Sequence, residues 1–288
     1  MANGMAALFV GSTGLRSAQT ALNTTAHNLS NINTAGYTRQ QVTFSDTQYV
    51  NIDTKDKVSN ASCGLGVAIS EVRRIRDQFI DQAYRNENSR LGFYESQYKA
   101  VEEIEDQFGE MQGVTYESYL VNLYNSVNEL AKNPSSTVAR SSLIQNATAF
   151  IEKSENVYQG LRDYQTTLNT QVKNMVQDIN DLGDTIYKLN KKIAKIEAAG
   201  IEKANDLRDE RDRTIDELSK YIDITYYETD SKEVVITAAN VPFVTMGERA
   251  VMDTRVVEGT NLVIPTWPGY ERDVYEDGKQ ASNVDDTD

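Results

Sequence analysis

The densest group of side chains with chemical potential lies around residue 210. Four carboxylates alternate there with three arginines: Asp206, Asp209, Glu210 and Asp212 with Arg208, Arg211 and Arg213. On a helix, residues four apart share a face, so Asp209 is predicted to pair with Arg213 and Asp212 with Arg208. A metal ion would need convergent, unpaired carboxylates, so ion pairs across the helix surface are favoured over a metal site.

The chain has one histidine, His27, and one cysteine, Cys63, so a multi-cysteine metal site and an internal disulfide are excluded. His27 lies among threonines and asparagines, with no carboxylate within one helical turn to orient it. A solvated surface residue is therefore favoured over a general base. Gly64 and Gly66 lack the third glycine of a dinucleotide loop. We expect no enzyme activity, no catalytic or metal site and no cofactor.

The composition is that of an acidic chain of moderate apolar content. Its 288 residues include 43 Asp and Glu against 29 Lys and Arg, for a formal net charge of −14, and the mean hydropathy is −0.54. Phosphate backbones and anionic lipids repel such a chain, so nucleic acid is not an expected partner. The apolar run at 5–10 is too short to span a membrane, and no membrane insertion is expected.

Residues 1–36 predict a helix with an incomplete heptad pattern. Leucine recurs every seven residues, and the positions three residues later are mostly small or polar: Leu8, Leu15, Leu22 and Leu29, followed by Gly11, Ala18, Thr25 and Ile32. Such a helix buries little apolar area by itself, so we expect it to be disordered alone and to order against a partner. The residues alone leave equally open an ordinary amphipathic helix packed on its own core.

The remaining chain predicts a rod of helices and then strands. We expect an extended connecting segment at 37–75, a rod-like helical bundle at 76–225, and a partial β domain with an acidic tail at 226–288. The predicted fold is mainly α, an elongated antiparallel bundle or coiled coil with a mobile N-terminal helix.

Within the rod, three patterns set the expected helices. Apolar residues share one helix face between 91 and 108, and further helices are expected over 116–132 and from 135 or 136. The longest periodic stretch, 157–196, would be about 60 Å long as a helix. Asn205 or Asp206 is expected to cap an antiparallel neighbour that begins after Gly200.

Two segments resemble bacterial flagellar axial proteins. The runs 14–22 and 27–40 are similar to the start of rod and hook proteins, and 36–40 looks like the hook-associated protein 1 (FlgK) family. The residues that carry this turn motif are Asn31, Asn33, Gly36, Tyr37, Arg39 and Gln40. The run 204–212, leading to 217–221, resembles that family's motif at the end of its helical domain.

The resemblance implies a structural protein at the hook–filament junction. It would be secreted by the flagellar type III apparatus and reside at the distal end of the hook. The implied partners are the hook subunit, the second junction protein, further copies in a ring layer and an export chaperone. The expected assembly interface is formed by Leu8, Leu15, Ala18, Leu22, Leu29 and Ile32. The C-terminal helix that family members pair with the N-terminal one is not found before Asp288.

Two alternatives stay open at this point. A flagellar rod or hook subunit would share the N-terminal helix, but the motif at 37–40 and the long bundle argue against it. A coiled-coil interaction protein unrelated to flagella would have no reason to carry the asparagine-rich turn at 31–36.

Overall fold

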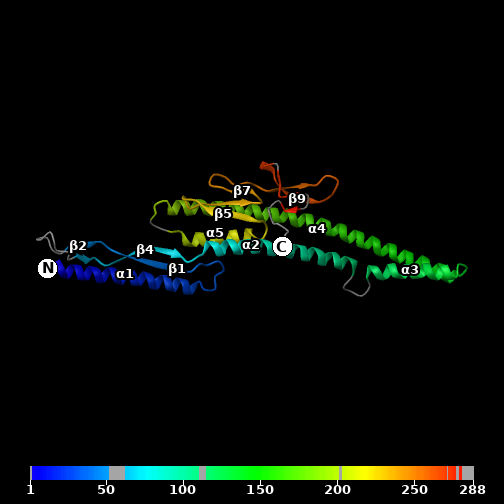
Figure 1. The fold of residues 1–288 in the computed structure, drawn as a ribbon, viewed down its shortest axis with the longest axis horizontal. Coiled ribbons are helices and arrows are strands. Elements are labelled where there is room, and N and C mark those ends of the chain that lie inside the picture. Colours follow the sequence, from blue (N-terminus) through cyan, green and yellow to red (C-terminus); the bar gives the residue numbers. More distant parts are fainter. Residues whose placement is uncertain are drawn as a thin grey trace.

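The computed structural model describes residues 2–51, 62–109, 115–200, 203–270, 272–276 and 279–280. The protein is an elongated, mainly helical molecule, as expected from the sequence (Figure 1). Its helices are α1 (Ala2–Ser30), α2 (Gln78–Phe108), α3 (Tyr116–Lys132), α4 (Thr137–Glu197) and α5 (Asn205–Leu218). The acidic tail at 281–288 lies outside the described residues.

The strands form small antiparallel sheets. The N-terminal strands are β1 (Gln40–Asp46), β2 (Tyr49–Asn51), β3 (Ser62–Gly64) and β4 (Val67–Arg74), and β1 pairs with β4 in a two-stranded ribbon. The C-terminal strands are β5 (Ile224–Glu228), β6 (Val234–Ala238), β7 (Val241–Val244), β8 (Asp253–Val256), β9 (Val263–Trp267), β10 (Arg272–Asp273), β11 (Tyr275–Glu276) and β12 (Lys279–Gln280). They form the sheets β5-β6-β7 and β10-β9-β8 and the pair β11-β12.

Local sequence explains where the long helices begin and end. The Asp77 side chain accepts a hydrogen bond from the Phe79 N–H at the start of α2, and Gly109 ends that helix with a φ of 74°. Ser136 caps α4 by accepting from the Ala139 N–H, directly after Pro134 interrupts the chain. The starts of α3 and α4 therefore lie where the sequence predicts them.

Two helix predictions need correction. The stretch at 157–196 and the helix from 135 or 136 are one helix, α4, with 61 residues and a length of about 90 Å. The two patterns looked separate because only the second half of α4 is periodic and buried. At α5 neither Asn205 nor Asp206 caps the helix: the N-cap position is Ala204, and the Asn205 side chain donates to the Val72 carbonyl of β4 instead.

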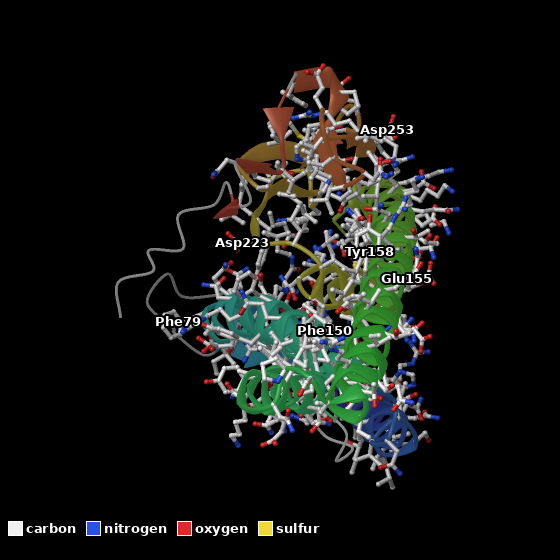
Figure 2. The ribbon with its side chains drawn as sticks, turned by 90° about the vertical axis from the view of Figure 1, so that its right-hand side faces the viewer. Phe79, Phe150, Glu155, Tyr158, Asp223 and Asp253 are labelled. Carbon is white, nitrogen blue, oxygen red and sulfur yellow. The ribbon has the colours of Figure 1, made fainter. Side chains whose placement is uncertain are left out.

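The apolar core lies where α4, α5 and the β5-β6-β7 sheet meet. Ile186, Ile215 and Ile236 are fully buried there, and Phe243 packs against Trp267. Viewed along the long axis, the strand that carries Asp253 lies at the top beside α4, and the helix that carries Phe79 lies below and to the left (Figure 2). Gly183 permits this packing, because a Cβ at that position would lie 2.3 Å from the Phe243 ring.

The far end of the rod is thinner than its core. The apolar residues predicted to share a helix face lie on α2, but three of them, Leu91, Tyr94 and Tyr98, are each more than half exposed. Ile144 and Ile151 of α4 are likewise exposed. In the described part of the chain, therefore, the helices of this end cover one another on one face only.

The buried seam of α4 gives the first testable prediction. Ile186→Asp places a charge in the core, and we expect it to lower the free energy of unfolding by about 4 kcal/mol or more and to abolish cooperative melting. Ile144→Asp on the same helix is the control and should change stability little. Thermal melts followed by circular dichroism test this, and an unchanged melting temperature for Ile186→Asp would contradict the core assignment.

The N-terminal helix gives a second prediction. The leucines of α1 lie on its exposed face, so the helix buries little apolar surface within this chain. We expect its amides in the monomer to exchange hydrogen at least tenfold faster than those at 182–193 of α4. Equal protection of the two segments, measured by mass spectrometry, would show that α1 is a stable part of the isolated fold.

Candidate assembly interface

The apolar stripe of α1 faces solvent along its whole described length. Its leucines are each between 69 and 74% exposed, and so is Ile32 in the turn directly after the helix: Leu8, Leu15, Leu22, Leu29 and Ile32. Ala18, the small residue of the second seam, is exposed as well. The five large side chains form an apolar surface that no described part of the chain covers. Such surfaces mark contact sites in soluble proteins.

The opposite face of α1 rests on the β1-β4 ribbon. Ser17 is buried, and its hydroxyl donates to the Val67 carbonyl of β4. Near the end of the helix, Asn28 donates to the Gln40 carbonyl at 2.8 Å, and its side-chain oxygen accepts from the Gln40 N–H at 2.9 Å. The ribbon therefore fixes which face of the helix is free.

The turn motif closes the connection between helix and ribbon. The Tyr37 hydroxyl donates to Asn28 Oδ1 at 2.6 Å, and the Asn31 amide donates to the His27 carbonyl at 3.0 Å. Asn33 and Arg39 are exposed, and the Arg39 carbonyl accepts from the Ile75 N–H. The turn residues thus lie together, and Asn28 at their centre is a member that the predicted set omitted.

A groove of about 610 Å³ runs between α1 and β1 beside this turn. Leu29 and Ile32 of the stripe line it together with Val42 and Phe44 of β1. Phe44 is itself 48% exposed. The apolar surface therefore continues from the helix onto the ribbon.

The turn motif meets the α5 motif directly, although about 170 residues separate them in sequence. The Thr38 N–H donates to Asp209 Oδ2 at 3.1 Å, and His27 Nε2 lies 4.0 Å from Asp206. Gly36, with a φ of 79°, lies against the aliphatic part of Arg213, where a Cβ would come within 3.1 Å. Glycine is favoured here both by the backbone conformation and by the close approach.

A buried network of ion pairs continues this contact; we call it the arginine–aspartate joint. It consists of Arg74 at the end of β4, Arg76 just after it, Arg85 of α2, and the α5 residues Asp209, Asp212 and Asp216. Arg74 donates to Asp209 at 2.8 Å and to Asp212 at 2.7 Å, and Arg85 donates to Asp216 at 2.7 Å. The joint therefore binds the ribbon, α2 and α5 together.

The joint perturbs the carboxyl group at its centre. Burial raises the pKa of Asp212, but Arg74 and Arg76 outweigh this effect and hold that pKa below its ordinary value. Arg85 is almost fully buried and also lies over the Tyr226 ring at 4.2 Å. The charges are thus paired in a site that excludes most water.

These contacts overturn the predicted pairs within α5. Asp209 and Asp212 bind Arg74 rather than Arg213 and Arg208. Arg208 instead pairs with Glu197 of α4, at 2.7 and 2.6 Å, and with Glu228. The predicted pairs within α5 do not form, because partners from other elements offer buried, charge-assisted hydrogen bonds.

Sequence reasoning missed Arg74, Arg76 and Arg85 as site residues. One signal was present: Asp209, Asp212 and Asp216 are spaced three and four apart, so they form a single acidic helix face. His27 is 45% exposed in its side chain, which agrees with the predicted surface position. Within the described ranges, no group of three acidic, histidine or cysteine residues could hold a metal ion, and no helix is both long and apolar enough to cross a membrane.

Two known sequence families match this chain, one over the N-terminal helix and its turn and one over most of the helical rod and the strands that follow it. The family described as the flagellar hook-associated protein FlgK helical domain matches residues 101–263, and that of the flagella basal body rod protein matches residues 8–38. The chain is 36% identical over 211 residues to flagellar hook-associated protein 1 of Bacillus subtilis, which covers 73% of this chain and 41% of that protein.

A second relative also carries the name flagellar hook-associated protein 1. The chain is 28% identical over 228 residues to flagellar hook-associated protein 1 of Salmonella typhimurium, covering 79% of this chain and 40% of that protein. It thus spans about two fifths of the length of these relatives. The flagellar hook junction protein FlgK from Burkholderia pseudomallei matches 64% of this chain and 32% of its own, with 15% identity and a TM-score of 0.49. Because the helical-domain family covers more than half of the sequence, the chain belongs to the flagellar hook-associated protein FlgK family.

Proposed function

We propose that this protein is a structural adaptor at the junction between hook and filament. In this proposal residues 1–36 are the axial segment, 37–75 connect it to the rod at 76–225, and 226–288 begin a β domain. The protein is exported through the flagellar type III apparatus, assisted by a chaperone. At the distal end of the hook it joins further copies in a ring layer, between the hook subunit and the second junction protein.

The observation that carries the proposal is the uncovered apolar stripe of α1. Four leucines of α1 and Ile32 in the turn after it stay exposed, while the other face of the helix is hydrogen-bonded to the ribbon. An apolar face held in a defined orientation suits insertion between neighbouring helices, where each buried leucine contributes about 1.5–3 kcal/mol. A marginal helix of this kind also suits export in an unfolded state.

A rod subunit is the second candidate, and the rod-family match at residues 8–38 favours it. A 38% identity over 84 residues with the flagellar basal-body rod protein FlgG of Agrobacterium fabrum points the same way. The helical domain supports the junction over the rod, because its family match covers most of the remaining chain. Labelled antibody on isolated hook–basal bodies separates the two: label at the hook tip supports the adaptor, and label along the rod supports the alternative.

The stripe is tested by changing it in the full-length gene product. Leu22→Asp with Leu29→Asp should leave melting of the helical domain unchanged, since both side chains are exposed, but should abolish incorporation at the hook tip. Asn23→Asp with Ser30→Asp adds the same charge on a different exposed part of α1 and should assemble normally. Secretion into the medium is measured separately for each variant.

Two outcomes would refute the role of the stripe. One is a leucine double variant that is secreted and still occupies the hook tip at the wild-type level. The other is collapse of the isolated domain, which would make the stripe an ordinary core face.

The arginine–aspartate joint gives a prediction on stability and pH. Asp212→Asn leaves Arg74 and Arg76 with a weaker partner in a buried site, so we expect a loss of about 2–4 kcal/mol in the free energy of unfolding at pH 7. Glu210→Gln, on the exposed side of the same helix, is the control and should change it by less than about 0.5 kcal/mol. Urea unfolding measures both.

The pH dependence follows from the lowered pKa of Asp212. The contribution of a carboxylate whose pKa is lowered by folding is present above its unfolded pKa of about 3.9, and is lost as the pH falls through the lower folded value. The wild-type protein should therefore lose more stability than Asp212→Asn between pH 5 and pH 3. If the free energies of unfolding of the two proteins fall equally between pH 5 and pH 3, Asp212 does not stabilise the joint through its charge.

A further inference from the structure

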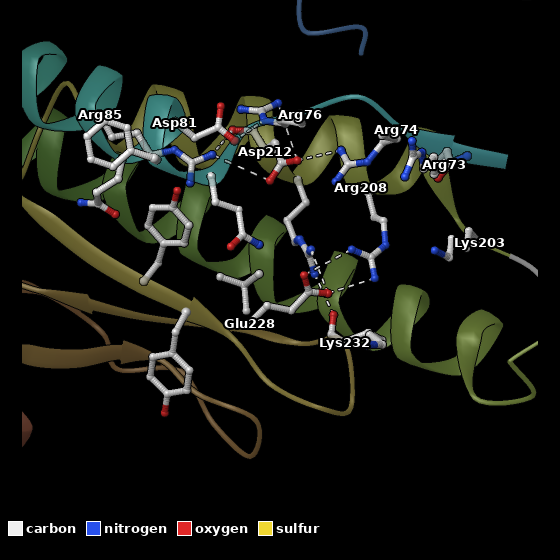
Figure 3. A pocket seen from close by; sticks show the side chains of 18 of the residues that line it. Arg73, Arg74, Arg76, Asp81, Arg85, Lys203, Arg208, Asp212, Glu228 and Lys232 are labelled. Carbon is white, nitrogen blue, oxygen red and sulfur yellow. Dashed lines mark hydrogen bonds and ion pairs between the residues drawn. The ribbon is translucent and has the colours of Figure 1, made fainter. Parts of the chain in front are cut away.

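A cavity of about 700 Å³ lies beside the arginine–aspartate joint, where the end of β4, the start of α2, α5 and the β5–β6 turn converge (Figure 3). Eight cationic side chains and only four carboxylates line it. These are eight of the 29 Lys and Arg residues of an acidic chain, gathered around one space. The formal charge of the lining side chains, 8 − 4 = +4, is therefore opposite in sign to the charge of the whole molecule.

Several of the cations are held in place by carboxylates, two of which, Asp81 and Glu197, belong to the same lining. Arg208 is fixed by Glu197 through two hydrogen bonds, and Arg76 is fixed by Asp81 at 2.6 Å. The carboxylates of Asp209 and Asp216, which hold other arginines of the joint, do not line the cavity. The guanidinium groups are therefore preorganised, so ordering them would cost a ligand little.

Other cations at the cavity have donors to spare. Lys232, in the β5–β6 turn, makes no ion pair with any residue that the structure describes. Arg73 makes a hydrogen bond of 3.3 Å to Gln41 and interacts electrostatically with Glu71, whose pKa it helps to lower. Both cations are exposed. They line the cavity from two segments, and Lys203, which forms an ion pair with Glu71, lines it from a third. Figure 3 shows Arg73 and Lys203 at the right of the view and Lys232 below, beside Glu228.

Arg211 supplies an independent observation at the same place. It is 1% exposed and its Nε has no hydrogen-bond partner in the described part of the protein. Burial lowers the pKa of Arg211 to about 10, although Asp212 and Glu228 act in the opposite direction. The neighbouring carboxylates therefore leave this cation under-compensated, and added negative charge in the cavity would stabilise it.

We propose that this cavity binds a multivalent oxyanion, namely a phosphate-type or polycarboxylate group. Fixed guanidinium groups match the planar, bidentate geometry that such groups offer, and the rim cations Arg73, Lys203 and Lys232 add charge from three different segments. A bound anion would bridge the ribbon, through Arg73, to the C-terminal sheet, through Lys232. The oxyanion can come from a free ion or from acidic side chains of a neighbouring protein.

Calorimetric titration of the full chain with three probes at constant ionic strength tests the proposal: pyrophosphate, citrate and the peptide triglutamate. We expect saturable binding of at least one probe, and a rise of about 5 °C in melting temperature at a hundred times its Kd. Tighter binding of pyrophosphate or citrate identifies a free ion as the source. Tighter binding of triglutamate identifies side chains of a neighbour.

Matched variants locate the binding. Arg73→Gln with Lys232→Gln should weaken it at least tenfold, and Lys203→Gln, a third cation of the lining, should weaken it in the same direction. Lys132→Gln with Lys192→Gln removes equal charge from exposed positions that do not line the cavity, and should bind as wild type does. The proposal is overturned if no probe binds below 10 mM, or if the rim and control variants bind equally.

Discussion

The arginine–aspartate joint is the interaction on which the arrangement of the whole molecule depends. It brings together a ribbon, two helices and the turn after α1 through charged groups whose partners lie more than 120 residues away in sequence. Buried ion pairs of this kind add little net stability, because desolvation offsets the attraction. Their effect is geometric: few other arrangements would satisfy both Arg74 and Arg85.

This constraint connects local structure to the proposed assembly. Asn28 and the turn hold α1 on the ribbon, and Asp209 holds the turn on α5. The exposed leucines therefore have a defined direction relative to the rod, even though they contact nothing within the chain. A polar, hydrogen-bonded face and an apolar, uncovered face on one helix are what a subunit needs when most of its apolar contacts come from its neighbours.

Sequence patterns predicted the elements better than their contacts. Heptad and helical spacing located α2, α3 and the second half of α4, because apolar residues gathered on one helix face recur with the 3.6-residue period. The joint could not be placed in the same way. Charged residues on α5 have favourable partners within their own helix, and the choice of Arg74 over Arg208 depends on a chain reversal that no local pattern encodes. Asn205 shows the same limit, since a tertiary hydrogen bond replaces its expected cap.

The two sequence segments that resemble the family, the turn at 36–40 and the run at 204–212, contact each other in the folded chain. The claim that this contact fixes ribbon and rod can be measured directly, with spin labels at Asp46→Cys on β1 and Lys192→Cys on α4 in a Cys63→Ser background. Pulsed electron paramagnetic resonance should give one narrow distribution of the distance between the two labels. This distribution should broaden when Asp209→Asn and Asp212→Asn are added. A broad distribution with the joint intact, or a narrow one without it, would contradict the account.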